Sequence, residues 1–220
     1  MAMRIPVMIL LIVMMMIITT GCDQMPVIPT PIPAHPMEDE ILPTPAATLP
    51  ELVHNILDTD MSVRLVSIYE LDKYGKGAII AIPALIDNLN VDDQELRVAA
   101  INALGHLGPD AKVAIPGLIN VLHNDSYYHA KSAAATALGS IGGHMIVPDL
   151  AAALLVDNTP HSYDIAISCA RSLATITGEK FRDSDSKTGY LIDKNGVPFL
   201  VIDARKWWLE TGQYYDWSSK

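Results

Sequence analysis

The sequence repeats itself about every 33 residues between positions 50 and 178. Four prolines recur at spacings of 33, 33 and 32 residues, and apolar residues follow each proline two and six positions later. Proline is tolerated in the first turn of a helix, and apolar residues four positions apart lie on one helical face. These prolines are Pro50, Pro83, Pro116 and Pro148. Each unit is therefore predicted to contain a short amphipathic helix that begins at its proline.

A second series of residues runs between the proline blocks. Leucine recurs at spacings of 33, 34 and 35 residues, and in three units glycine follows four residues later. The residues are Leu71, Leu104, Leu138 and Leu173, with Gly75, Gly108 and Gly142. Glycine adopts the left-handed conformation at a helix end at the least cost. Each unit is thus predicted to be a first helix, a glycine turn and a second helix. Because one unit alone cannot bury its apolar face, the units must stack into an all-α, α-α superhelix.

The period and two segments resemble the HEAT repeat, specifically the short HEAT-like type found in phycobilisome lyases. The matching segments are LGHLGPDA at 104–111 and AIPGL at 114–118. The resemblance covers residues 50–178 and implies a HEAT/armadillo-type solenoid of about three and a half to four repeats, which needs a cover at each end.

In this family an acid and an arginine at the first helix tie successive repeats together. Asp60 with Arg64, and Asp93 with Arg97, match that pattern, and both acids are also expected to cap their helices. The third unit departs from the pattern, with Tyr128 and His129 after Asp125. The resemblance therefore implies a ladder confined to the first two units.

Residues 1–21 have the order of a secretory signal. One charge at Arg4 precedes an apolar run over residues 5–18 and a short stretch of small residues before Cys22. The end of this segment resembles the lipobox of bacterial lipoproteins, although Thr19 stands where that family usually has leucine. The resemblance implies that 1–21 is a lipoprotein signal peptide and that Cys22 is lipid-modified. The protein would then be exported and membrane-anchored on the periplasmic or extracellular side. An uncleaved signal anchor and ordinary secretion remain open as alternatives.

Residues 22–49 are predicted to form a proline-rich tether. Seven prolines between positions 26 and 45 prevent regular helix and favour extended polyproline conformations. The tether would separate the repeats from the membrane.

Residues 179–220 are predicted to form a C-terminal cap with a small β-hairpin. Asn195-Gly196 is a strong turn signal and lies between the apolar segments 190–192 and 199–202. Aromatic residues gather in this tail, where they either fill the core of a capping helix or form a ligand platform. They include Trp207, Trp208, Tyr214, Tyr215 and Trp217.

The composition argues against several classes of site. Lys plus Arg number 15 against 25 Asp plus Glu, and this net charge of -10 disfavours binding to a nucleic-acid phosphate backbone. The sequence has no Gly-rich phosphate loop, and Cys22 and Cys169 do not space like zinc ligands. Cys169 lies in an apolar pattern and is expected to pack as a small hydrophobic residue. Histidines in the turns are expected to be solvated: His106, His123, His129, His144 and His161. We therefore expect no catalytic residue, no metal, no cofactor and no enzymatic activity.

Binding to a protein partner is the function that these features favour. Two-helix solenoids usually bind through a groove lined by the second helices, and tyrosines between units offer a second contact strip. The candidates are Asp87, Asn88, Asn120, His123 and Asp149 on the second helices, with Tyr127, Tyr128 and Tyr163 in the strip. The protein is expected to be a monomer. One alternative is a structural spacer of the envelope without a defined ligand. The other is a lyase-like enzyme related to phycobilisome lyases.

Overall fold

The computed structural model describes residues 47–156, 161–182, 192–195 and 197–218. Contacts divide the chain into two units, Met1–Pro45 and Ala46–Lys220, and the described residues all belong to the second unit. The predicted signal peptide at 1–21, Cys22 and nearly all of the predicted tether at 22–49 therefore lie outside the described residues. Within the described ranges, no helix is both long enough and apolar enough to cross a membrane.

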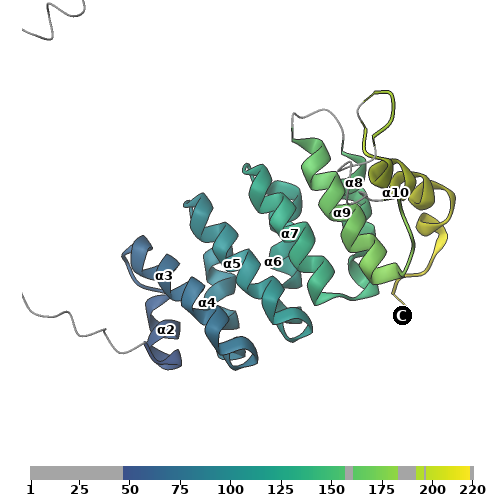
Figure 1. Cartoon of the computed structure of the whole chain (residues 1–220). Coiled ribbons are helices and arrows are strands. Elements are labelled where there is room, and N and C mark those ends of the chain that lie inside the picture. Colours follow the sequence, from purple (N-terminus) through teal and green to yellow (C-terminus); the bar gives the residue numbers. More distant parts are fainter. Residues whose placement is uncertain (1–46, 157–160, 183–191, 196, 219–220) are drawn as a thin grey trace, which may run out of the picture. The chain divides into compact units, whose positions relative to one another are not determined.

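The first helices of the units form one row, called here the first row. They are α3 (Met61–Leu71), α5 (Gln94–Leu107), α7 (Tyr128–Ile141) and α9 (Ser162–Thr177). Each helix of this row packs against the next helix of the same row. Figure 1 shows them following one another in this order.

The second helices form a second row against the first. They are α4 (Ile82–Asp87), α6 (Ile115–Asn124) and α8 (Val147–Leu155), and each has its proline in the first turn, as predicted. In space, α4 packs on α5, α6 on α7 and α8 on α9. The remaining elements are α2 (Leu49–Asn55), α10 (Phe199–Glu210), and the 3-10 helices η1 (Asp72–Ala81), η2 (Asn88–Asn90), η3 (Gly108–Ala114), η4 (His144–Ile146) and η5 (Gly212–Tyr214). The predicted all-α, α-α solenoid is confirmed.

Glycine ends α5 and α7 as predicted, whereas Gly75 lies within η1, after α3 has ended at Leu71, with a φ of 49°. Gly108 and Gly142 follow α5 and α7 with φ angles of 60° and 75°, and Gly178 follows α9 with a φ of 77°. A residue with a Cβ atom adopts such angles only at a steric cost. Gly108 and Gly142 let the chain leave α5 and α7 and turn back toward the second row.

Small residues bring the first-row helices into close contact. A Cβ atom added to Gly139 of α7 would lie 2.3 Å from Ser172 Oγ and 3.0 Å from Ser172 Cα, on α9. A Cβ atom added to Gly105 of α5 would lie 3.1 Å from Cα of Ala137, on α7. Ser172 Oγ also donates a hydrogen bond of 2.8 Å to the carbonyl of Ala135. The small residues thus set the spacing between units.

Replacing Gly139 with alanine is expected to lower the free energy of unfolding by about 1–2 kcal/mol, because overpacking typically costs about 1–3 kcal/mol. The added methyl group would meet Ser172 Cβ at 2.7 Å, and this clash outweighs the gain of up to about 1 kcal/mol in helix propensity. Urea unfolding followed by circular dichroism measures the change. The control is Ser140→Ala at the next, exposed position, which should change stability by less than about 0.5 kcal/mol. A Gly139→Ala variant as stable as the parent would contradict this packing.

The prediction of a β-hairpin is correct at the turn and wrong for the strand that was expected to follow it. The Asp193 N–H donates to the Val197 carbonyl at 2.9 Å, and Ile192 and Pro198 form an isolated antiparallel bridge. Residues 199–202, predicted as a strand, form the first turn of α10 instead. The Pro198 carbonyl accepts the N–H groups three and four residues later and so starts this helix. A short apolar run fits a strand and a helix equally well, which explains the error. Positions 190 and 191 of the other predicted strand lie outside the described residues.

The C-terminal segment covers the last unit, as the cap prediction requires. Helix α10 packs on α9 and α8, and it buries Leu200, Val201 and Ala204. Trp217 is also buried, and its indole Nε1 donates to the Gly212 carbonyl at 2.9 Å. The apolar end of the solenoid is thereby removed from solvent.

The five aromatic residues named in the tail divide into two groups. Trp207 and Trp208 are partly buried against the same core as Trp217. Tyr214 and Tyr215 are instead 78% and 51% exposed. The tryptophans therefore belong to the cap, and the two tyrosines face solvent.

Candidate protein-binding surface

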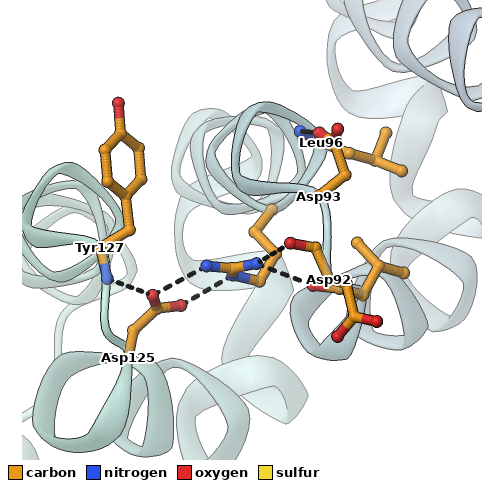
Figure 2. Close-up of polar contacts among 7 residues, drawn as sticks. Asp92, Asp93, Leu96, Asp125 and Tyr127 are labelled. Atoms are coloured by element: carbon orange, nitrogen blue, oxygen red, sulfur yellow. Dashed lines mark hydrogen bonds and ion pairs between the residues drawn. The ribbon is translucent and has the colours of Figure 1, made fainter.

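A buried ion pair joins the second and third units. Arg97 of α5 donates from Nε to Asp125 Oδ2 at 2.8 Å and from Nη2 to Asp125 Oδ1 at 2.9 Å. Arg97 Nη1 donates to the carbonyls of Val91 and Asp92 at 2.8 and 2.9 Å. Only 9% of the Arg97 side chain and 6% of the Asp125 side chain are exposed. Figure 2 shows Asp92 and Asp125 in two successive turns between helices, with Leu96 on α5.

Asp125 also positions Tyr127 at the start of α7. Asp125 Oδ1 accepts the backbone N–H of Tyr127 at 2.7 Å, as drawn in Figure 2. Burial alone raises the pKa of the Asp125 carboxyl. Hydrogen bonds from Arg97 and from the Tyr127 backbone, with the charges of Arg97 and Lys131, outweigh burial and hold this pKa below its ordinary value. The carboxylate therefore stays ionised at neutral pH and keeps the Tyr127 backbone in place.

The acid–arginine ladder differs from the one that the resemblance implied. Asp60 and Asp93 cap their helices as expected, accepting backbone N–H groups two and three residues later, each at 2.8 Å. Arg97, however, reaches forward to Asp125 in the third unit. The expectation of a ladder confined to the first two units is therefore wrong. The third unit lacks the arginine but still supplies the acid.

Asn88 is fully buried, so its prediction as an exposed partner contact is wrong. Its Oδ1 accepts from Arg64 Nε at 3.1 Å and from Nη2 at 2.5 Å. Its Nδ2 donates to the carbonyls of Ile56 and Ala84 at 3.2 and 2.7 Å. A buried amide is tolerated where its donors and acceptor are satisfied in this way. Asn88 therefore closes the junction of α2, α3 and α4.

The other candidates of the second row lie at the surface. Asp87 and Asn120 are exposed, whereas His123 and Asp149 are half-buried. His123 Nε2 lies 3.5 Å from Asp149 Oδ1 and so links α6 to α8. The structure thus brings together two of the predicted residues.

Tyrosine and histidine rings stack at the starts of α7 and α9. The rings of Tyr128 and His161 are parallel within 8°, and their centroids are 3.7 Å apart. The His129 ring centroid lies 3.9 Å from that of Tyr128 and 5.1 Å from that of Tyr127. Tyr163 of α9 is 39% exposed. Two of the predicted tyrosines therefore form one aromatic cluster with two histidines that were expected only to be solvated.

A groove of about 640 Å³ lies along the first row. Helix α3 contributes Tyr69, α5 contributes Val98 and Asn102, and Tyr127 and Thr136 come from the start and the body of α7. The lining thus combines aromatic, aliphatic, amide and hydroxyl groups, as protein interfaces do. The binding groove was expected along the second helices, whereas this groove lies on the first.

Tyr127 is the one predicted residue that lines this groove. A signal for the others is present in the sequence, because Gln94, Val98 and Asn102 are spaced by four residues and therefore share one face of α5. The spacing alone does not tell whether that face meets a neighbouring helix or solvent. Whether this face of α5 is exposed depends on how α3 and α7 pack against α5.

Neither a cluster of metal ligands nor an exposed thiol is found among the described residues. Among them, no group of three or more His, Cys, Asp or Glu side chains could hold a metal ion. Cys169 is fully buried in α9, and burial raises the pKa of its thiol to about 12. Cys169 therefore packs as a small apolar residue, as predicted.

A comparison with protein families agrees with this architecture. A family model described as HEAT repeats matches residues 82–174, from the start of α4 into α9. The chain therefore contains a HEAT-repeat domain. The chain is also similar to a solved structure, the complex of CpcE and CpcF of phycocyanin lyase from Nostoc sp. PCC7120. The identity is 23%, the match covers 64% of this chain and 70% of that chain, and the TM-score is 0.49. No curated protein matches the sequence.

Proposed function

We propose that this protein is a non-catalytic scaffold of the bacterial cell envelope, which binds a protein partner and is held at the membrane by a lipid on Cys22. The HEAT-repeat domain supports the scaffold role, because such repeats commonly present extended surfaces for protein binding. The observation that carries the proposal is the groove along the first row, with its lining of tyrosine, amide and hydroxyl groups.

The groove suits a protein partner because part of it is preorganised. Tyrosine is among the residues that supply most of the binding energy at interfaces. The Tyr127 backbone is already fixed by the buried Arg97–Asp125 pair, so less conformational freedom is lost on binding. Across the groove, Tyr69 is 54% exposed and offers a large contact area.

The anchor is supported by the sequence before the folded unit. Residues 1–21 have the order of an export signal, and Cys22 stands where a lipoprotein carries its lipid. One acyl chain gives only marginal membrane binding, so stable anchoring requires the two or three chains that this modification supplies. The tether at 22–49 would then let the groove face a partner away from the bilayer.

Replacing Cys22 with serine is expected to abolish metabolic labelling with palmitate and to release the protein from the membrane fraction. Labelling in growing cells, followed by fractionation, measures both effects. Cys169→Ala is the matched control, because Cys169 is the only other cysteine and should leave labelling intact. Persistent labelling of Cys22→Ser would refute the anchor without bearing on the groove.

A photo-crosslinking residue at Asn102 is expected to join the full chain to one envelope protein in cells. Asn102 is exposed and lines the groove. The matched position is Val113, which is 69% exposed in η3 and lies outside the groove. Mass spectrometry should identify the same protein repeatedly from Asn102 and not from Val113. Equal background from both positions would favour the structural spacer.

A further inference from the structure

A second hollow, of about 390 Å³, lies at the C-terminal cap, apart from the groove. Trp208, Tyr215 and Trp217 contribute to its lining, together with Met145, Pro148 and Asp216. The ring centroids of Tyr215 and Trp217 are 5.3 Å apart, and the two planes meet at 35°. Aromatic rings from α10 and from the segment after η5 therefore gather at one place.

The two indole rings of this hollow are packed in place. The hydrogen bond from Trp217 Nε1 to the Gly212 carbonyl fixes one indole, which also stacks on His144 with centroids 6.0 Å apart. A Cβ atom at Gly212 would lie 2.7 Å from Trp208 Cε3, so the glycine allows the second indole to pack closely. The two tryptophans are thus in place before any ligand arrives.

The lining of the hollow carries negative charge. Asp216 is the one residue with a formal charge among the described residues that line it. Asp216 Oδ1 accepts the N–H and the hydroxyl of Ser218 at 3.0 and 2.6 Å, and these bonds restrict the orientation of the carboxylate. Aromatic faces are electrically negative, so rings and carboxylate act in the same direction. The chain as a whole, with a net charge of -10, adds to this field.

We propose that this hollow binds an organic cation, either a quaternary ammonium group or the side chain of a lysine. A cation placed over Trp or Tyr faces is attracted by their quadrupoles, and the Asp216 carboxylate adds a charge interaction. An anion would meet the negative faces and the carboxylate, and a purely apolar ligand would leave the carboxylate facing an apolar group. This inference does not depend on the groove or on the lipid anchor.

Titration of the full chain in a non-ionic detergent with choline tests the proposal. The three tryptophans of the chain are Trp207, Trp208 and Trp217, so intrinsic fluorescence reports directly on the cap. Choline should produce a saturable change, and its uncharged isostere 3,3-dimethyl-1-butanol should bind about tenfold more weakly, the ratio that corresponds to about 1.4 kcal/mol. Equal affinity for choline and 3,3-dimethyl-1-butanol would overturn the proposal. The absence of a saturable change with both choline and Nα-acetyl-lysine methylamide would also overturn it. A tighter fit for choline would point to a headgroup, and a tighter fit for the lysine compound to a protein side chain.

Variants of exposed residues locate the binding. Tyr215→Ala and Asp216→Asn are each expected to weaken cation binding about fivefold or more. Tyr214→Ala is the matched control, since Tyr214 is adjacent, 78% exposed and outside the hollow, and it should keep the parent affinity. Circular dichroism checks that each variant retains its helix content. If Tyr214→Ala loses as much affinity as Tyr215→Ala, the cation does not bind in this hollow.

Discussion

Replacing Leu104 with aspartate is expected to unfold the repeat domain or to lower its free energy of unfolding by several kcal/mol. Leu104 lies on α5 and is fully buried between the two helix rows. Loss of a buried leucine side chain alone costs about 2–5 kcal/mol, and an unpaired buried charge adds to that cost. Domains of this size are stable by only about 5–15 kcal/mol, so the loss is a large fraction of the total. Thermal unfolding of residues 47–220 followed by circular dichroism at 222 nm measures it.

The control for this prediction lies on the same helix. Asn102→Asp adds the same charge two residues earlier, at an exposed position, and should shift the midpoint of unfolding only slightly. If Leu104→Asp melts at the parent temperature, Leu104 does not point into the core and the repeat register is wrong.

Replacing Arg97 with methionine is expected to cost about 3–5 kcal/mol, because it leaves the Asp125 carboxylate buried without its partner. The variant also loses the hydrogen bonds to the Val91 and Asp92 carbonyls. Urea unfolding at pH 7 measures the change in free energy. Arg64→Met is the matched control, because Arg64 donates to the neutral side chain of Asn88. A hydrogen bond of this kind contributes about 1.5–3 kcal/mol, and the control should lose about that much stability.

The two variants should differ in their dependence on pH. The pKa of Asp125 is lowered in the folded state, so its contribution to stability is present above the unfolded value of about 3.9 and is lost as the pH falls through the folded value. The cost of Arg97→Met should therefore shrink in acid, because protonation has already weakened the pair in the parent. The cost of Arg64→Met should stay constant, since Asn88 does not titrate. A pH-independent cost for Arg97→Met would show that the pair contributes through packing alone.

The helices could be predicted because their signals act locally. A proline such as Pro116 favours the first turn of a helix whatever surrounds it, and a glycine such as Gly108 ends one for steric reasons. The burial of Cys169 could be predicted for the same kind of reason, from the apolar residues beside it.

Features that depend on two distant segments were not predictable in this way. Asn88 looked exposed because a polar residue at the end of a short helix usually is, and only its contacts with Arg64 and Ile56 explain its burial. Residues 199–202 became a helix because they begin directly after Pro198 and cover the last unit. The position of the groove depends on which row of helices faces solvent, and no residue within one repeat specifies which row that is.

The contacts that hold the array together are built from different chemistry along the chain. An amide and an arginine join α2, α3 and α4 at its start, a buried ion pair joins the second and third units, and the junction of the third and fourth units relies on Ser172 lying where Gly139 leaves room for it. Many repeat arrays can gain or lose a unit by duplication, because their neighbours are interchangeable. In this chain, a duplicated unit would face a neighbouring surface whose contacts fit a different unit. The order of the second, third and fourth units is therefore set by the contacts at their junctions.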